Sequence, residues 1–87
     1  MMTEQQQMPK YLCGKTVWAL KIKRVDINHQ GKALLLIEDE GFAPVEVSKE
    51  YVDKHQPEAG GYYVVYVGGY KSFSPAEVFD AGYEKIV

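Results

Sequence analysis

Apolar and polar residues alternate along the first long segment of the chain, residues 11–27, and this alternation predicts a β-strand. Trp18, Leu20 and Ile22 fall on one face at a period of two. The opposite face begins with Val17 and becomes polar where lysines replace the apolar residues. One face is therefore expected to be core, and the other to become solvent-exposed toward the end of the strand.

Residues 28–31 have the composition of a turn, so the first strand and a second strand over residues 32–38 are expected to form a hairpin. The continuous apolar run of the second strand indicates burial on both faces or a central position in the sheet. An acidic segment ends this strand. Residues 43–47 then predict a short third strand, in which Pro44 favours a sheet edge or a strand start.

A short helix over residues 49–55 is predicted to follow the third strand, because Ser48 can cap its first turn. Tyr51 and His55 are four residues apart and should share one face of this helix. Pro57 is expected to end it.

Residues 62–67 carry the strongest strand signal in the chain, since β-branched and aromatic residues occupy every position. Gly68 and Gly69 can supply the two positive φ angles of a two-residue turn. Residues 70–73 should therefore return antiparallel beside the first of these strands.

A second helix is predicted to begin at Ser74, which can act as the cap, with Pro75 in the first helical position. Gly82 can close this helix in the left-handed conformation. Phe79 and Tyr83 are four residues apart and are expected to dock the helix on the sheet. Residues 84–87 are expected to add a final strand.

Together these elements predict an α+β fold: a small, strongly bent antiparallel sheet or SH3-like barrel of four to five strands, with two short helices. A chain of 87 residues has room for one core. Residues 1–9 show no apolar periodicity and are expected to form a flexible tail. Residues 10–87 would then make up a single domain.

The spacing of Gly, Pro and aromatic residues, chiefly in the carboxy-terminal half, resembles that of a family of short proteins encoded by tailed phages and prophages. The positions that carry the resemblance are Trp18, Ala19, Gly60, Tyr63, Val64, Val65, Gly69, Tyr70, Ser72, Ser74, Pro75, Phe79, Tyr83 and Ile86. Where many relatives have Gly-Asp before the strand, this chain has Gly60 and Gly61. The family has no assigned activity, so the resemblance implies a phage accessory protein and supplies no catalytic role.

The formal net charge of −2 argues against a non-specific nucleic-acid binder, which would present a strongly basic field. Cys13 is the single cysteine, so the chain can build neither an intramolecular disulfide nor a multi-cysteine zinc site. The longest apolar run, residues 33–37, is far shorter than the roughly 20 residues that span a bilayer. We therefore expect a cytoplasmic protein without a membrane partner.

The polar residues show no pattern typical of catalysis or of metal binding. His29 lies in a predicted turn and His55 at a helix end, so surface or capping roles are expected for both, and the chain is not expected to be an enzyme. The acidic run at residues 38–40 lacks the ligand spacing of a calcium loop and is interpreted as a solvated connection. Neither a metal nor a cofactor is assigned.

The predicted hairpin carries more aromatic residues than a sheet with one buried face would need. The candidate binding surface comprises Trp18, Tyr62, Tyr66, Tyr70, Lys71 and Phe73. Tyrosine and tryptophan anchor many interfaces, and a free sheet edge beside them favours pairing with another chain. A core built from aromatic rings would explain the same residues equally well.

Three functions follow from these observations. The first is a non-enzymatic phage or prophage accessory protein that binds a host or phage protein, as a small homo-oligomer. The second is a small-ligand binder that sequesters a nucleotide-like signal, which requires a pocket that combines rings with Lys15, Lys71 or Arg24. The third and weakest is a nucleic-acid-binding small barrel that uses a basic stripe of Lys15, Lys21, Lys23 and Arg24.

Overall fold

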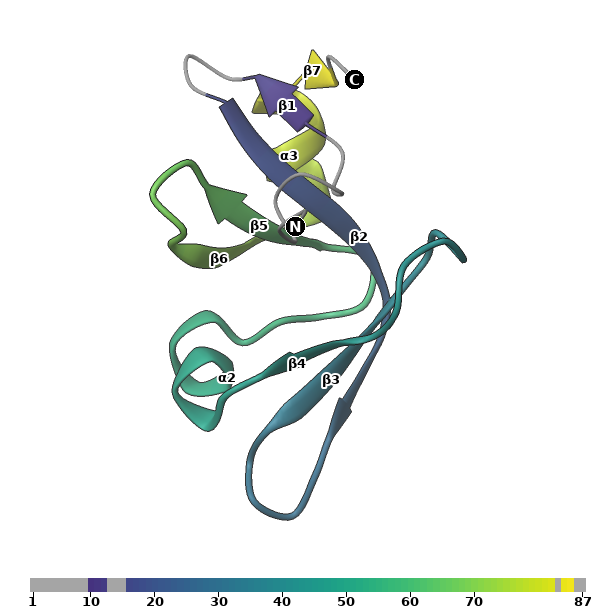
Figure 1. Cartoon of the computed structure of the whole chain (residues 1–87), viewed down its shortest axis with the longest axis vertical. Coiled ribbons are helices and arrows are strands. Elements are labelled where there is room, and N and C mark those ends of the chain that lie inside the picture. The colour runs from purple at the N-terminus through teal and green to yellow at the C-terminus, as the bar shows by residue number, and fades with distance from the viewer. Residues whose placement is uncertain (1–9, 13–15, 83, 86–87) are drawn as a thin grey trace, which may run out of the picture.

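The computed structural model describes residues 10–12, 16–82 and 84–85. Five antiparallel strands, β2 to β6, form a strongly curled half-barrel with two short helices and two further short strands, β1 and β7 (Figure 1). In chain order the elements are β1 (Lys10–Leu12), β2 (Thr16–Ile27), β3 (Ala33–Ile37), β4 (Val45–Val47), α2 (Lys49–His55), β5 (Tyr62–Tyr66), β6 (Lys71–Ser74), α3 (Ala76–Gly82) and β7 (Glu84–Lys85). The predicted small α+β fold with a strongly bent antiparallel sheet is confirmed.

The strand β2 belongs to both halves of the curled sheet. Residues 17–21 pair with β5, and residues 22–27 pair with β3, both antiparallel. We call one half the β5 sheet; it contains the first half of β2 with β1, β5, β6 and β7. We call the other half the β3 sheet; it contains the second half of β2 with β3 and β4. The register shifts between Ile22 and Arg24, which leaves Lys23 as an extra residue. Such a bulge bends a strand and increases its twist, so β2 turns from one sheet into the other (Figure 1).

The single long strand expected over residues 11–27 is divided into β1 and β2, and residues 13–15 lie outside the described part of the chain. The expected change along the polar face of β2 is confirmed. Val17 is fully buried at its start, Lys21 is half-buried, and Lys23 is exposed.

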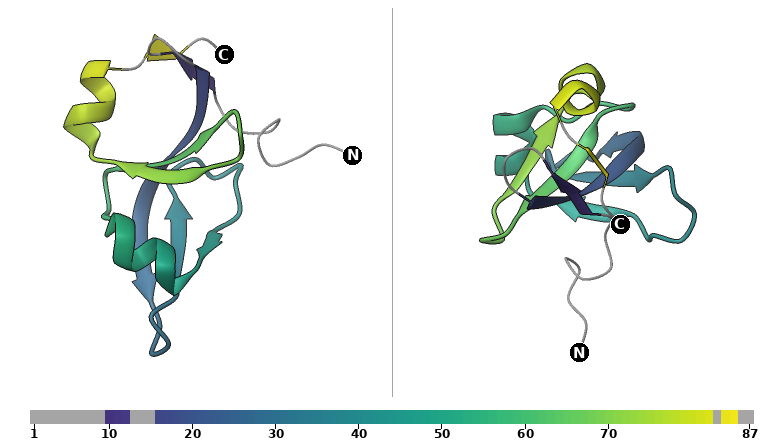
Figure 2. Two further views of the ribbon diagram at one scale, coloured as in Figure 1. Left: turned by 90° about the vertical axis from the view of Figure 1, so that its left-hand side faces the viewer. Right: turned by 90° about the horizontal axis from the view of Figure 1, so that it is seen from above.

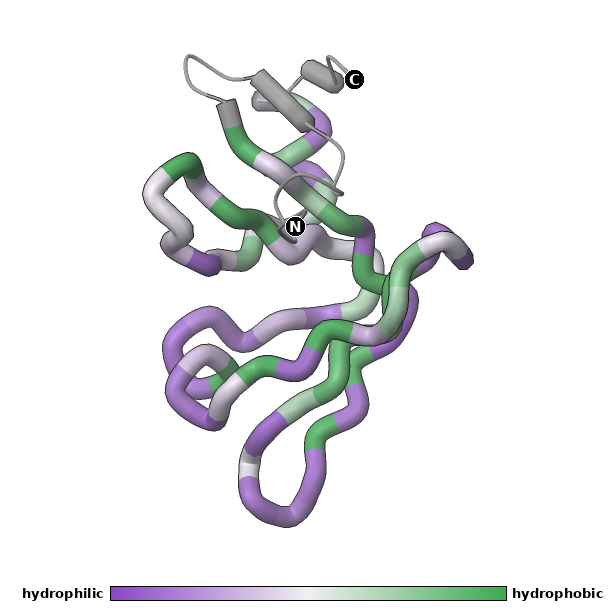
Figure 3. The backbone as a smooth tube through the Cα atoms, in the orientation of Figure 1, coloured by the Kyte–Doolittle hydropathy of each residue, from purple (hydrophilic) through white to green (hydrophobic). Residues whose placement is uncertain are grey.

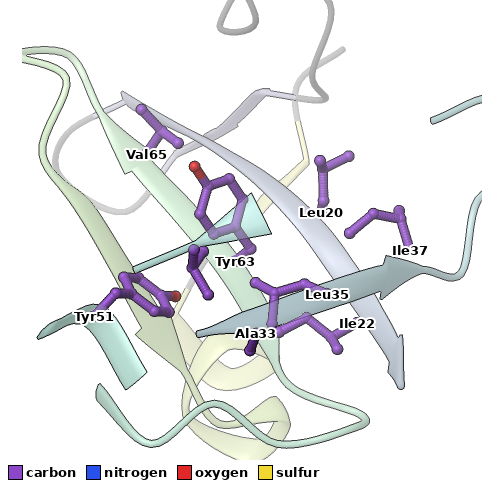
Figure 4. Packing of buried hydrophobic residues seen from close by; sticks show 9 residues of the cluster. Leu20, Ile22, Ala33, Leu35, Ile37, Tyr51, Tyr63 and Val65 are labelled. Atoms are coloured by element: carbon purple, nitrogen blue, oxygen red, sulfur yellow. The ribbon is translucent and has the colours of Figure 1, made fainter. Parts of the chain in front are cut away.

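The main core fills the inside of the curl. It gathers apolar side chains from both sheets and from α2: Leu20, Ile22, Ala33, Leu35, Ile37, Val47, Tyr51, Tyr63 and Val65. Figure 4 shows these side chains converging from elements that are far apart in the sequence. The hydropathy view agrees with this arrangement, because apolar positions follow β2 and β5 while the turn between β2 and β3 is hydrophilic (Figure 3).

A second, smaller core lies on the opposite face of the β5 sheet, beneath α3. Its members are Val17, Ala19, Tyr62, Val64 and Phe79. Phe79 stacks on Tyr62 with ring centroids 4.1 Å apart, so the expected docking of this helix through Phe79 is confirmed. The two helices lie on different sides of β6 (Figure 2), and the β5 sheet is therefore covered on both faces.

Among the described residues no helix covers the outer face of the β3 sheet, and the burial of its central strand β3 differs between the two faces. Ala33, Leu35 and Ile37 are buried, whereas Leu34 is 43% exposed and Leu36 is half-buried. The central position of β3, between β2 and β4, is as predicted, and burial of both faces is wrong. The outward face of β3 meets no described helix, so Leu34 and Leu36 stay partly exposed although they belong to a continuous apolar run.

The hairpin of β5 and β6 is confirmed, but its turn differs from the prediction. The Tyr66 N–H donates to the Tyr70 carbonyl at 2.9 Å, and the Gly69 N–H donates to the Tyr66 carbonyl at 2.8 Å. These bonds enclose a three-residue loop in which Gly69 alone has a positive φ, of 91°. The predicted two-residue turn with a positive φ at both glycines is therefore wrong. Gly68 lies within the turn that the bond from Gly69 to Tyr66 closes, and its φ is not positive.

The helix ends follow the predictions in α2 and depart from them in α3. The Ser48 hydroxyl oxygen accepts from the Tyr51 N–H at 3.1 Å, which confirms the predicted cap. Ser74 instead ends β6, and its hydroxyl donates to the Pro75 carbonyl at 3.4 Å, so the predicted serine cap of α3 is wrong. The helix starts at Ala76, so Pro75 precedes it and the predicted first helical position is wrong. Gly82 is the last helical residue and is not among the described glycines with a positive φ, so the predicted left-handed closure is wrong as well. Tyr83 lies outside the described residues.

Gly61 packs closely against the end of β6. A Cβ atom there would lie 2.4 Å from the Phe73 ring and 2.9 Å from the Ser74 carbonyl oxygen. Gly61→Ala should therefore lower the free energy of unfolding by about 1–3 kcal/mol, measured by urea denaturation. Gly68→Ala is the matched control, because no heavy atom lies within 4 Å of the added Cβ. It should change stability by no more than about 0.5 kcal/mol. Equal effects of the two substitutions would contradict the packing described.

Candidate functional site

The six residues of the predicted binding surface do not lie on one face of the molecule. Trp18 and Phe73 are half-buried and pack against the main core. Tyr62 is only 8% exposed, and its hydroxyl donates to Asp80 at 3.1 Å. For these three rings the structure favours the aromatic core, which the sequence left open beside a binding surface. Both faces of the β5 sheet are covered, so these aromatic residues pack into two cores.

The remaining three residues gather at the tip of the hairpin. Tyr66 is half-buried against the second core and stacks on Tyr70 with ring centroids 5.9 Å apart. Tyr70 is 49% exposed, and Lys71 is exposed beside it. The hairpin tip is therefore the part of the predicted surface that a partner can reach.

A groove of about 340 Å³ runs beside this tip, between the end of β4, the helix α2 and the start of β6. The residues that line it are Glu46, Val47, Ser48, Glu50, Tyr51, Lys54, His55 and Lys71. Since β4 and β6 are edge strands in the described sheet, the groove lies along the open seam of the half-barrel. Its lining combines the rings of Tyr51 and His55 with charged side chains of both signs.

Tyr51 joins the helix to the far side of the seam. Its ring is buried in the main core, and its hydroxyl donates to the Ser72 carbonyl in β6 at 2.6 Å. Burial, followed by the proximity of Tyr63 and Tyr70, raises the pKa of Tyr51 well above its ordinary value. The side chain thus stays neutral and acts as a fixed hydrogen-bond donor that holds one wall of the groove against the other.

His55 lies between two tyrosines. Its ring centroid is 4.7 Å from that of Tyr51 and 6.0 Å from that of Tyr70, and its Nε2 lies 3.4 Å from the Tyr70 hydroxyl oxygen. Burial, and secondarily the charge of Lys54, lowers the pKa of His55. The imidazole is therefore neutral at pH 7 and extends the aromatic wall.

The cations of the groove are Lys54 and Lys71. Lys54 places its Nζ 5.2 Å from the centroid of the Tyr70 ring, within the range of a cation–π interaction. Among the described residues, neither Lys54 nor Lys71 lies within 4.0 Å of a carboxylate, whereas Lys49 pairs with Asp53 at 2.6 Å. Lys54 and Lys71 are thus available to an incoming group.

The predicted basic stripe on β2 is interrupted in the structure. Lys21 is half-buried, with its Nζ 5.8 Å from the centroid of the Tyr62 ring. Arg24 forms an ion pair with Asp26 at 3.0 Å. Lys23 is exposed at the bulge, and Lys15 lies outside the described residues. The described members of the stripe therefore do not present adjacent free cations.

Residues 17–82, whose side chains are described, contain no group of three or more His, Cys, Asp or Glu residues that could hold a metal ion. In the acidic run, Asp39 accepts from the Gly41 N–H at 2.9 Å, as in a turn. The Ser48 hydroxyl oxygen accepts from the Tyr51 N–H at 3.1 Å, so this groove residue takes part in the cap of α2. Within the described part of the chain, no helix is both long and apolar enough to cross a membrane.

A comparison of the chain with known protein families, with curated proteins and with solved structures found no match in any of the three. The resemblance of its Gly, Pro and aromatic spacing to short phage proteins remains an expectation.

Of the residues that line the groove, only Lys71 was among the candidates chosen from the sequence. The residues missed are Glu46, Val47, Ser48, Glu50, Tyr51, Lys54 and His55. The available signal was the pairing of Tyr51 with His55 on one face of a helix, which was predicted and is confirmed. The sequence did not show that this face meets β6, because that contact joins residues 21 positions apart.

The bond between Tyr51 and β6 leads to a prediction about stability. Tyr51→Phe removes a part-buried hydrogen bond and keeps the ring, so the free energy of unfolding should fall by about 0.5–1.5 kcal/mol. Tyr70→Phe removes an exposed hydroxyl and should have an effect below about 0.5 kcal/mol. Both are measured by urea denaturation at pH 7. A larger effect at Tyr70 than at Tyr51 would contradict the assigned role.

The raised pKa of Tyr51 predicts a loss of stability in alkali. Above a pH of about 10 the unfolded chain releases this phenolic proton while the folded chain retains it, so the free energy of unfolding falls as pH rises. Tyr51→Phe abolishes this component. The stability difference between wild type and variant should thus shrink between pH values of about 8 and about 11. A difference that stays constant or grows would show that Tyr51 does not titrate as described.

Proposed function

We propose that this chain is a non-enzymatic accessory protein that binds a partner protein through the groove and the adjoining hairpin tip. The observation that carries the proposal is Tyr70, which is 49% exposed and lies between His55, Lys54 and Lys71 at the edge of the groove. A phage or prophage origin, with a host or phage protein as the partner, is the expectation that the carboxy-terminal motif adds.

The surroundings of Tyr70 are those of an interface anchor. Its ring is held on one side by Tyr66 and on another by His55, so little side-chain freedom remains to be lost on binding. Tyrosines of this kind supply much of the binding free energy at protein interfaces when flanking residues exclude water. The charged residues of the groove would form the polar rim around such an anchor.

A small nucleotide-like ligand is the second candidate. The groove combines rings with Lys71, as that function requires, and its volume of about 340 Å³ falls within the range of small-molecule sites. However, Glu46 and Glu50 line the same groove and would repel a phosphate chain. A protein segment, which can present both signs of charge, fits this lining better. A nucleic-acid-binding barrel is the weakest candidate, because the basic stripe on β2 is interrupted by the Arg24 ion pair.

Partner capture with matched variants tests the proposal. The full chain, carrying an affinity tag, is incubated with lysate of the cells that carry its gene, and bound proteins are compared for wild type, Tyr70→Ala and Val78→Ala. Val78 is 61% exposed on α3 and lies outside the groove. Loss of an anchor tyrosine typically weakens binding by roughly 10- to 100-fold, so a partner should be retained by wild type and Val78→Ala and lost by Tyr70→Ala.

Two results would contradict the proposal. One is a set of captured proteins that Tyr70→Ala does not change. The other is a nucleotide-like molecule retained by the purified protein in native mass spectrometry, which would favour the second candidate. The same spectrum reports the subunit number and so tests the expected homo-oligomer.

A further inference from the structure

The four charged residues of the groove are sorted by sign. Glu46 lies in β4 and Glu50 in the first turn of α2. Lys54 lies in the last turn of α2, and Lys71 begins β6. The groove therefore has an acidic end and a basic end.

The contacts of α2 fix the direction of this charge separation. The Tyr51 hydroxyl meets Ser72, whereas His55 meets Tyr70 one helical turn later. The carboxy-terminal end of α2 thus points to the hairpin tip, and the basic end of the groove adjoins the exposed Tyr70. The acidic end lies toward β4.

None of these four charges is neutralised by an ion pair among the described residues, where the ion pairs are Arg24–Asp26 and Lys49–Asp53. Lys49 and Asp53 occupy the same helix but do not line the groove. The groove therefore presents two separated charges of each sign to whatever binds there. A segment of uniform charge would be attracted at one end and repelled at the other.

The spacing of Glu50 and Lys54 matches an extended chain. Four residues along an α-helix cover about 6 Å. Two residues along an extended strand cover about 6.5 Å and place both side chains on the same face. A strand lying along α2 can therefore set one side chain against Glu50 and the next side chain on that face against Lys54.

We infer that the groove recognises an extended segment of a partner protein in which an acidic and a basic residue are separated by one residue. The acidic side chain contacts Lys54 and Lys71, the basic side chain contacts Glu50 and Glu46, and a neighbouring residue packs on Tyr70. This inference rests on the proposed function and adds the chemistry of the partner.

The test is a selection of random heptapeptides displayed against the full chain. Enriched peptides should carry opposite charges two positions apart, in one preferred order. A double variant, Glu50→Lys with Lys54→Glu, keeps the net charge and reverses the polarity of the groove. Peptides enriched on this variant should carry the two charges in the opposite order, and the original peptides should bind it roughly five- to tenfold more weakly.

The matched control exchanges the ion pair that lies on the same helix outside the groove. Lys49→Asp with Asp53→Lys should leave the affinity of the original peptides unchanged within about twofold. Amide spectra of both variants confirm that each is folded. A loss of affinity in this control equal to that in the groove variant would overturn the inference, since the effect would then not come from the groove.

The remaining outcomes separate the inference from the proposed function. Enriched peptides without a charge pair, or with the same charge order on the reversed variant, would overturn the inference. If those peptides still lose affinity in Tyr70→Ala, the proposed function stands. Failure to enrich any peptide overturns the inference as well, because a short extended segment should suffice. The proposed function fails with it only if partner capture is also insensitive to Tyr70→Ala.

Discussion

The architecture of this protein depends on one strand serving two sheets. The first half of β2 pairs with β5 and the second half with β3, and the extra residue at Lys23 lies where the pairing changes. A straight β2 could pair with β5 and with β3, but the two sheets would then lie side by side and could not enclose one core. The bend brings their inner faces together, so that Leu20 and Leu35 share a cluster with Tyr63.

The same bend leaves an open seam between the edge strands β4 and β6, and the groove lies along this seam. Curling places the edge strands β4 and β6 on either side of α2, which follows β4 directly. Tyr51 then ties α2 to β6 by a hydrogen bond to Ser72, so that a helix rather than further strand pairing spans the opening. Because α2 is amphipathic, its buried face completes the core while Glu50 and Lys54 remain in the groove. The candidate site is thus a consequence of how the sheet is closed.

Local signals in the sequence were sufficient for most elements. The Ser48 cap predicted α2, and the aromatic and β-branched run of β5 predicted the hairpin with β6. What could not be predicted depends on contacts distant in sequence. The Tyr62 ring is buried because α3 returns over it with Phe79, and the outward leucines of β3 are partly exposed because no described helix covers them. The contact between Tyr51 and Ser72 is likewise invisible to a local pattern, so the groove was missed although Tyr70 and Lys71 were identified.

Proton–proton nuclear Overhauser effects of the full chain in solution can establish whether α2 and β6 form the two walls of one groove. The structure predicts cross-peaks between the Tyr51 ring and protons of Ser72, and between the rings of His55 and Tyr70, whose centroids lie 6.0 Å apart. Both sets observed together would place the helix against the hairpin as described. Absence of both, in a spectrum that shows the β2–β5 contacts, would mean that α2 does not close the seam and that the groove does not exist.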